Sequence, residues 1–400
     1  MSYATTQLHP IMFQDDTIRL TSSIEAAQKG NTIMNSAMKR KQLELNADKC
    51  CVIVFDRKSK AKSTREIINN NSLLSIGHQM IKAKEKDKYL GDILHEGGLG
   101  KSVEATISDR YGKTFAAIIE IGSVINYFRI DAIGGLKAGL GIFELCVILS
   151  LLNNSDMWVE IESASTKRLE DMQNMMFKNL FAVPHSVPTP SLRSDLGCLA
   201  MDERIDKRKL NLLFHLRNLE TSALANEIYE MQKFYNFPGL VSECRKLIIK
   251  YRLPNIIDMD IQMTKLQWKN LVKKAIINYS SENLKLQFKT YSKLKDGPLI
   301  EGDLSIEPYV QDMKLRDART LFRLRTQMLP AKFNMKSSPK FSNESWKCDF
   351  CKKIDSQSHI MWCPSFAPLR EGRNINDDKD LVDYIQQVFK IREDFENKKA

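Results

Sequence analysis

Four residues toward the C-terminal end of the sequence have the types and the spacing of a metal site. Cys348 and Cys351 are separated by two residues, His359 follows after seven more, and Cys363 after a further three. Thiolate and imidazole groups are preferred ligands of Zn²⁺, and three thiolates with one imidazole complete a tetrahedron. The spacing therefore predicts a structural zinc ion with no open position for chemistry. The alternative is a set of unrelated cysteines beside a histidine.

The segment that carries these four residues mixes aromatic and basic side chains. Such side chains can stack on bases and pair with phosphates, which predicts a nucleic-acid-binding surface. Packing inside a small unit is an equal alternative for the aromatic rings. The residues concerned are Trp346, Phe350 and Trp362 with Lys347, Lys352, Lys353, Arg370 and Arg373. From this set we assign nucleic-acid binding to Trp346, Lys352 and Lys353.

A second basic stripe is predicted upstream of the metal segment. On a helix, Arg316, Arg319 and Arg323 fall on one face while Leu315 and Phe322 fall on another. This helix could pack by its apolar face and present its arginines to a phosphate backbone. An ordinary solvated helix face is the commoner meaning of such a run. The same two interpretations apply to a basic cluster of Arg204, Lys207, Arg208 and Lys209.

Two adjacent carboxylates, Asp15 and Asp16, stand between short apolar runs within residues 9–20. This pattern predicts two strands joined by a tight turn that exposes both acidic side chains. A hard cation such as Mg²⁺ binds carboxylate oxygens and phosphates together, so the pair could hold this ion. Most such pairs are solvated turn residues, and the turn alone does not distinguish the two.

Length and composition indicate a globular chain of two or three domains, since 43% of its 400 residues are hydrophobic. Lys and Arg outnumber Asp and Glu by 60 to 49, and the net charge of +11 favours polyanions such as nucleic acid. Lys137 and Glu144 interrupt the most apolar region, so we expect no membrane segment. The sequence also shows no secretory leader. We therefore expect an intracellular protein, nuclear or cytoplasmic.

The elements that must position these side chains follow from periodicity. Ser22 or Ser23 is expected to cap a helix that runs to about residue 44. Residues 51–55 predict a buried strand, residues 56–71 a loop, and residues 79–94 two strands around a turn rich in Lys and Glu. Helical periodicity then prevails, in residues 136–152, 166–181, 201–219, 223–234 and most of 238–331, with a closing helix over 380–395 that starts at Asp377, Asp378 and Asp380.

Four motifs follow one another along the sequence: Phe13-Gln14-Asp15-Asp16, Leu45-Asn46-Ala47-Asp48-Lys49, Tyr89-Leu90-Gly91-Asp92 and the four metal-site residues. Their order resembles that of reverse transcriptases from non-LTR (LINE-like) retrotransposons. In that family the first motif is the catalytic turn of the palm, the second carries a palm lysine, and the third is the primer grip that leads into a helical thumb. A C-terminal knuckle of three cysteines and one histidine completes the series.

The resemblance implies specific roles for these residues. Asp15 would bind Mg²⁺, Asp16 would be its less direct neighbour, and Lys49 would neutralise or protonate the leaving pyrophosphate. The alternative for Lys49 is an ordinary surface lysine. The primer-grip positions would be Tyr89, Leu90 and Gly91, although Tyr89 could equally be a packed strand aromatic. Gln14 departs from the family, which usually has alanine there. The partners would be an RNA template and a DNA primer.

The predicted fold is α+β and mostly helical. Its parts would be a partial polymerase palm of short antiparallel strands plus a helix (residues 1–98), a helical thumb (99–236), a basic helical region (237–336), and a small zinc knuckle with its closing helix (337–400). Two-metal catalysis needs a further aspartate from an earlier palm strand, and residues 1–14 contain no acidic residue.

We therefore expect a truncated fragment of an RNA-directed DNA polymerase that is inactive by itself. The alternative is a non-catalytic RNA- or DNA-binding protein that contains the zinc knuckle. A titration of RNA at several salt concentrations would distinguish such a protein from an inert fragment, because phosphate contacts make binding depend steeply on salt.

Overall fold

The computed structural model describes residues 11–13, 16–56, 60–127, 132–291, 304–335 and 346–398. Contacts divide the chain into two compact units, each with a hydrophobic core. The first unit comprises residues 1–111 and 157–165, and the second comprises residues 112–156 and 166–400. The finer division into palm, thumb, basic region and knuckle stays a prediction.

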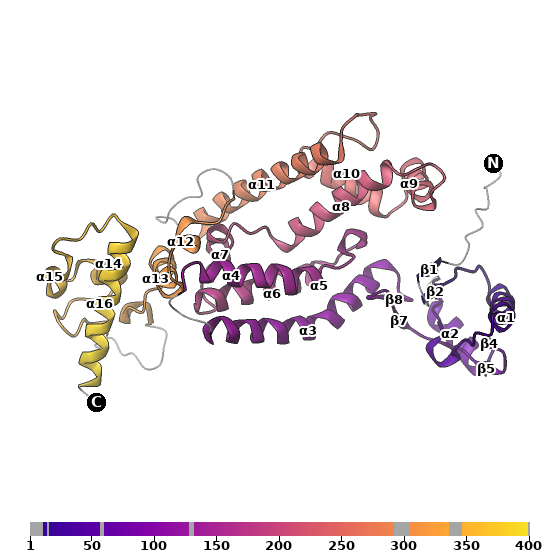
Figure 1. Ribbon diagram of the computed structural model, residues 1–400, viewed down its shortest axis with the longest axis horizontal. Helices are drawn as coiled ribbons and strands as arrows, with labels where there is room; N and C mark the ends of the chain where they lie inside the picture. The colour runs from indigo at the N-terminus through magenta and orange to yellow at the C-terminus, as the bar shows by residue number, and fades with distance from the viewer. Residues whose placement is uncertain are drawn as a thin grey trace. The chain divides into compact units, whose positions relative to one another are not determined.

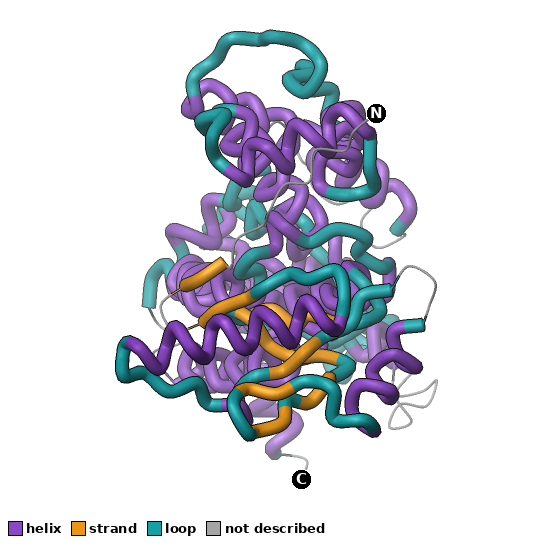
Figure 2. The backbone as a smooth tube through the Cα atoms, turned by 90° about the vertical axis from the view of Figure 1, so that its right-hand side faces the viewer, coloured by secondary structure: helices purple, strands orange, loops and turns teal. Residues whose placement is uncertain are grey.

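Helices make up most of the described chain, and the strands are only two to four residues long. In Figure 2 helices are purple and strands orange. The predicted mostly helical character is therefore confirmed, whereas the polymerase palm stays a prediction. None of the helices in the described part of the chain has both the length and the apolar character needed to span a bilayer.

The first unit opens with a short antiparallel hairpin, as predicted. Strand β1 (Ile11–Phe13) pairs with β2 (Asp16–Ile18), and Phe13 stands opposite Asp16. Helix α1 (Ile24–Arg40) follows, with the Ser23 hydroxyl accepting a hydrogen bond from the Ala26 amide at 3.1 Å. The helix ends about four residues earlier than predicted, because Gln42 adopts a left-handed φ of 58° that no α-helix continues.

Two predictions for the following segment are wrong. The strand predicted over residues 51–55 is only β3 (Cys51–Val52), which is half-buried and pairs in parallel with β6 (Lys82–Ala83). Within the loop predicted over residues 56–71, α2 (Ala61–Asn70) is a helix. Its apolar stripe is narrow, because only Ala61 and Ile68 are buried, and the surrounding charged residues mask it in the sequence.

The region predicted as one strand pair over residues 79–94 contains more strands. Strand β5 (Gln79–Met80) pairs with β4 (Ser75–Ile76), while β7 (Lys86–Tyr89) pairs with β8 (Asp92–His95), all antiparallel. The tight turn of the second pair lies at Leu90 and Gly91, with φ of 47° and 90°, and not at the Lys- and Glu-rich stretch. Positive φ at both central residues is what a two-residue hairpin needs.

Long helix α3 (Leu99–Tyr127) follows the hairpin and is tied to β8 by hydroxyl groups of its first turns. The Ser102 hydroxyl accepts from the His95 amide at 2.9 Å, and the Thr106 hydroxyl from the Ile93 amide at 2.8 Å. Side chains of α3 therefore satisfy two backbone amides of β8.

The second unit consists of helices at the predicted places. Helix α4 (Gly135–Ile142) continues through a π-helical segment, η2 (Phe143–Ile148), into α5 (Leu149–Leu151). The next helices, shown in Figure 1, are α6 (Ser163–Phe181), α7 (Thr189–Asp195), α8 (Met201–Arg217), α9 (Leu224–Tyr235), α10 (Leu240–Lys250), α11 (Lys265–Thr290), α12 (Pro308–Asp312) and α13 (Leu315–Arg325).

Helix α8 lies at the centre of this arrangement and packs against α9, α10 and α11. The fully buried indole of Trp268 stacks on Phe214 with ring centroids 5.6 Å apart and donates to the Leu210 carbonyl at 3.0 Å. A large aromatic ring with its polar edge satisfied fixes the register of α11 on α8.

The C-terminal part of the second unit contains α14 (Gln357–Trp362), α15 (Ala367–Arg370) and α16 (Asp378–Asn397). The prediction of a closing helix is confirmed. Asp377 caps it, since its Oδ1 accepts from the amides of Lys379 and Asp380. The acidic cluster is thus a helix start, as predicted.

Candidate metal centre

A tight turn places the first two predicted ligands. The Cys348 amide donates to the Lys353 carbonyl at 2.7 Å, and the Lys352 amide donates back to the Cys348 carbonyl at 2.9 Å. Lys352 takes a left-handed φ of 65° to close this turn. The backbone around Cys348 and Cys351 is therefore shaped by local hydrogen bonds.

A short helix places the other two ligands. The Ser356 hydroxyl caps α14 by accepting from the His359 amide at 3.1 Å. The helix ends at Trp362, and Cys363 follows directly as its C-terminal cap. Residues four apart on a helix lie on one face, so His359 and Cys363 point in the same direction.

The four ligand atoms converge. They all lie within 4.8 Å of one another. The Cys351 sulfur is 3.7 Å from that of Cys363 and 3.2 Å from His359 Nε2, and the sulfurs of Cys348 and Cys363 are 4.0 Å apart. Zn–S bonds of about 2.3 Å in a tetrahedron place sulfurs about 3.8 Å apart. The group could therefore bind a metal ion such as zinc.

The surroundings shift the pKa values of three of these ligands. Burial raises the pKa of Cys363 to about 11 and lowers that of His359, which keeps the imidazole neutral. Burial also acts to raise the pKa of Cys351, but hydrogen bonds from the Lys353 amide and the other two thiols outweigh it and lower that pKa. Crowded thiolates repel one another, and a bound cation would remove this repulsion.

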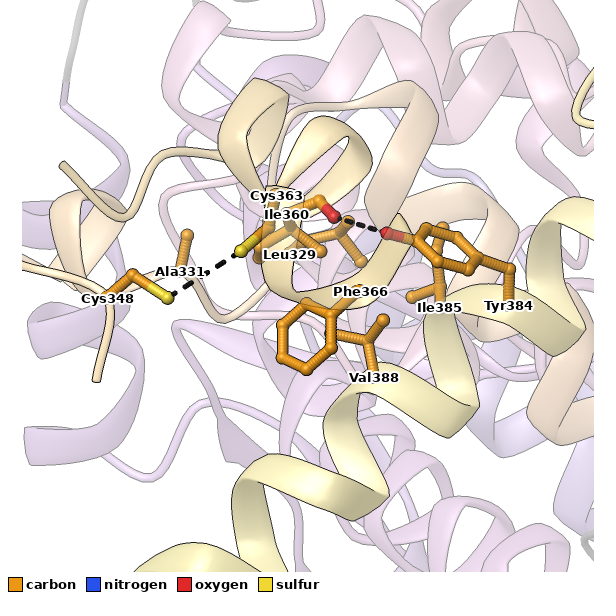
Figure 3. Packing of buried hydrophobic residues seen from close by; sticks show 9 residues of the cluster. All are labelled: Leu329, Ala331, Cys348, Ile360, Cys363, Phe366, Tyr384, Ile385 and Val388. Carbon is orange, nitrogen blue, oxygen red and sulfur yellow. Dashed lines mark hydrogen bonds between the residues drawn. The ribbon is translucent and has the colours of Figure 1, made fainter. Parts of the chain in front are cut away.

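A hydrophobic core supports the centre from the side of α16. Cys348 and Cys363 pack with Ile360, Phe366 and Val388, all buried. Figure 3 shows the two sulfurs directed toward one another at the edge of this cluster. The Tyr384 hydroxyl donates to the Ile360 carbonyl at 2.9 Å, which ties α16 to the helix that carries His359.

The aromatic residues of this segment differ in exposure. Trp346 is half-buried and packs edge-on against Phe333, with centroids 5.8 Å apart, so the packing alternative describes it best. Trp362 is 64% exposed, and the Arg370 guanidinium lies 5.7 Å from its ring centroid. The sequence-based assignment of nucleic-acid binding to Trp346, Lys352 and Lys353 omits Trp362. Its position at the end of a six-residue helix, just before a ligand, is the signal that could have singled it out.

The basic residues assigned to binding also differ. Lys352 and Lys353 are exposed. Arg319 donates to the Leu180 carbonyl at 2.7 Å, and Arg323 donates to the Ala182 carbonyl, both at the C-terminal end of α6. Burial lowers the pKa of Arg319 to about 10. Arg316 alone of the predicted stripe has a mostly exposed side chain, at 59%.

A groove of about 880 Å³ runs between α13, α16 and the turn that carries Cys348. Its basic and acidic side chains are mixed, and two phenylalanine rings are also part of its lining. The lining includes Arg316, Arg323, Lys332, Asp349, Phe350, Phe389, Lys390, Arg392 and Glu393.

The palm-like residues lie in the first unit. Gln14 and Asp15 fall outside the described residues, and Asp16 is the first residue of β2. Lys49 is exposed at the end of a 3₁₀ turn, η1 (Ala47–Lys49). Within the described ranges, no second group of three or more acidic, cysteine or histidine side chains comes together. The Mg²⁺ site therefore stays a prediction.

The primer-grip-like residues form the tip of the β7–β8 hairpin. Tyr89 is half-buried, and Leu90 and Gly91 make the turn. Arg110 of α3 donates to the Gly91 carbonyl at 2.9 Å and to the Asp92 carboxylate at 2.7 Å. Sequence patterns do not predict these contacts, because Arg110 is about twenty residues from Gly91 and Asp92 and lies on a different element.

The basic cluster on α8 is mostly paired within the chain. Arg204 binds both Glu144 oxygens at 2.7 and 2.6 Å, and Lys209 pairs with Glu243. Arg208 donates to the Leu152 carbonyl at the end of α5. These contacts of Arg204, Arg208 and Lys209 join α8 to its neighbours.

Comparisons of the chain with known protein families, with curated proteins and with solved structures found no match. The family resemblance therefore depends on the order of the sequence motifs alone.

Proposed function

We propose that Cys348, Cys351, His359 and Cys363 bind one structural zinc ion that holds the C-terminal segment together. The observation that supports this most directly is the convergence of four ligand atoms within 4.8 Å. Thiolate-rich sets favour zinc over Mg²⁺ or Ca²⁺, which prefer oxygen ligands. Four protein ligands leave no position for a substrate, so the ion stabilises the fold and performs no chemistry.

We further propose that this zinc-bound segment binds single-stranded nucleic acid. Lys352 follows the ligand Cys351, and Trp362 precedes the ligand Cys363, whose sulfur is 3.7 Å from that of Cys351. An exposed ring can stack on a base while lysines meet the phosphates. The C-terminal knuckle of the retrotransposon reverse transcriptases suggests the same role by resemblance.

For the whole chain we propose a fragment of an RNA-directed DNA polymerase of the non-LTR type. Supporting features are the β1–β2 hairpin at the acidic motif, the β7–β8 hairpin at the primer-grip-like motif, and the helices that follow. In this proposal Asp15 and Asp16 belong to the Mg²⁺ site and Lys49 acts on the pyrophosphate. Two-metal catalysis requires a further carboxylate, and we propose that the chain alone does not polymerise.

A non-catalytic nucleic-acid-binding protein is the second candidate. It is favoured by the observation that, among the described residues, the zinc-type group is the one metal-ligating set that assembles. In this case the acidic turn would have no catalytic role.

Two experiments test these proposals. Metal analysis of the purified chain should give one zinc per chain, and Cys363→Ser should lose it, while Cys146→Ser, outside the centre, should keep it. A fluorescent single-stranded RNA titrated at several salt concentrations should show affinity that falls as salt rises. Salt-independent or absent binding would disprove the nucleic-acid role. Primer extension on an RNA template with Mg²⁺ by the chain alone would disprove the inactive-fragment proposal.

A further inference from the structure

A cavity of about 310 Å³ lies within the second unit, far along the sequence from the metal centre. Its lining residues come from α4, the π-helical segment η2, α8, α11 and the segments 196–199 and 304–306. Figure 1 labels the three α-helices. π-Helical turns inside helices are frequent at functional sites. This one carries Glu144, whose side chain lines the cavity.

Three cations and one carboxylate line this cavity. They are Arg204 and Lys207 of α8, Lys273 of α11, and Glu144. Both oxygens of Glu144 are taken by Arg204, at 2.7 and 2.6 Å, so this carboxylate is already neutralised. The charges of the two lysines are left over, which gives the cavity a surplus of two positive charges.

The two lysines lack counter-charges of their own. In the part of the chain that the structure describes, neither Lys207 nor Lys273 forms a hydrogen bond or ion pair with an acidic side chain. Burial lowers the pKa of Lys207, and the charges of Lys273 and Arg204 lower it further, while the Glu144 carboxylate, which Arg204 already binds, acts to raise it. Like charges held close together cost stability unless an anion lies between them.

The remaining walls are apolar and fixed in shape. Leu140, Ile277 and Ile306 line the cavity and reduce the local polarity, which strengthens the attraction between opposite charges. Gly197 adopts a left-handed φ of 61°, and a Cβ there would lie 2.6 Å from the Ser305 backbone. Only glycine allows this wall to approach so closely.

We propose that this cavity binds a phosphate group between Lys207 and Lys273. A phosphate monoester carries nearly two negative charges at neutral pH, which matches the surplus of the cavity. The phosphate could belong to a small phosphorylated compound or to a nucleic-acid backbone. The site shares no residue with the metal centre and does not depend on the function proposed for that centre.

Inorganic phosphate is the probe for this site. Titration calorimetry at constant ionic strength, with chloride as the reference anion, should give one phosphate bound per chain. Lys207→Met and Lys273→Met should each weaken this binding about tenfold, because each removes one charged hydrogen bond. Lys274→Met is the matched control: it is the next residue on the same helix and is exposed as Lys273 is, but it does not line the cavity, so binding should be unchanged.

Thermal unfolding supplies a second readout. Without phosphate, Lys207→Met should raise the melting temperature, since repulsion from Lys273 is removed, and phosphate should then add less stability than in the original chain. If a methionine variant fails to fold, Lys207→Gln serves in its place. Phosphate that binds no better than chloride, or binding retained when both lysines are replaced, would overturn the proposal.

Competition distinguishes the two sources of the phosphate group. Displacement of inorganic phosphate by a short single-stranded RNA, lost in Lys207→Met, assigns the site to a backbone phosphate. Phosphate binding that RNA leaves unchanged assigns it to a small phosphorylated compound. Cys363→Ser should retain phosphate binding in both cases, so failure of the zinc proposal and failure of this one are separable.

Discussion

Arg392 of α16 binds both carboxylate oxygens of Asp355, at 2.6 and 3.0 Å. Asp355 is fully buried in the loop between the two pairs of metal ligands, and its Oδ2 also accepts from the Lys332 amide at 2.9 Å. A charge buried so deeply needs its partner, because removal of one member of a buried pair leaves the other without compensation. The pair therefore couples the metal-binding loop to the C-terminal helix.

Replacement of Arg392 by methionine should destabilise the C-terminal segment by about 3 kcal/mol, the usual cost of breaking a buried ion pair. Urea unfolding followed by tryptophan fluorescence measures this change. Lys390→Met, an exposed position on the same helix, is the control and should change stability little. Equal effects of the two substitutions would show that the Asp355 pair does not support the fold.

Removal of the metal should unfold the C-terminal segment and spare the first unit. A small metal-stabilised unit loses most of its folding free energy with the ion. Hydrogen exchange before and after treatment with a chelator should show loss of protection in residues 346–398, while the backbone of α1 and α2 keeps its protection. Protection that persists in residues 346–398 without metal would contradict the structural role.

Metal affinity should fall as pH is lowered. Ligation requires thiolates, and in the absence of metal the pKa of Cys363 is about 11, so its proton must leave when the ion binds. The metal-bound form has lower thiol pKa values than the free form, and its stability is therefore lost as pH falls. Proton release during zinc titration in dilute buffer measures the effect. Binding without proton release would mean that the thiols are not ligands.

Substitution of Trp362 should affect RNA binding, whereas substitution of Trp346 should affect stability. Trp362→Ala should weaken single-stranded RNA binding by about 1–3 kcal/mol, the usual contribution of one stacked base, with little effect on folding. Trp346→Ala should instead lower stability, because its ring packs on Phe333. Binding assays paired with thermal unfolding distinguish the two. RNA binding that is insensitive to Trp362 would exclude it as a stacking platform.

Two arginines of α13, Arg319 and Arg316, should also differ in whether their substitution affects stability or RNA binding. Arg319→Ala should cost about 1 kcal/mol of stability, since it removes hydrogen bonds to carbonyls at the end of α6. Arg316→Ala should leave stability unchanged and, if the stripe meets RNA, reduce the dependence of binding on salt. Loss of RNA affinity in a fully folded Arg319→Ala variant would contradict the capping role.

Local features were the ones that sequence reasoning could predict. The convergence of Cys348 and Cys363 is predicted by the spacing of four metal ligands within a short segment. The Ser23 cap is predicted because a serine stands directly before a helical pattern. Helix α2 was missed because two buried residues among charged neighbours give a weak periodic signal.

Contacts between distant residues were beyond prediction. Arg319 meets Leu180 at a separation of 139 residues, so no spacing in the sequence marks it as a capping residue. The same holds for Arg392 and Asp355, and for the exposure that favours Trp362 over Trp346. Each depends on which faces the packed helices cover, and an isolated helical pattern does not contain that information.

The spacing of the metal ligands has a consequence for the order of folding. The four ligands span sixteen positions, whereas Arg392 lies 37 residues beyond Asp355. Short loops close faster than long ones, so residues 348–363 can bind the ion before α16 packs against them. The metal would then serve as a folding nucleus. The packing of α16 onto the preformed centre would be the slower step, and the ion pair between Arg392 and Asp355 would then stabilise the centre.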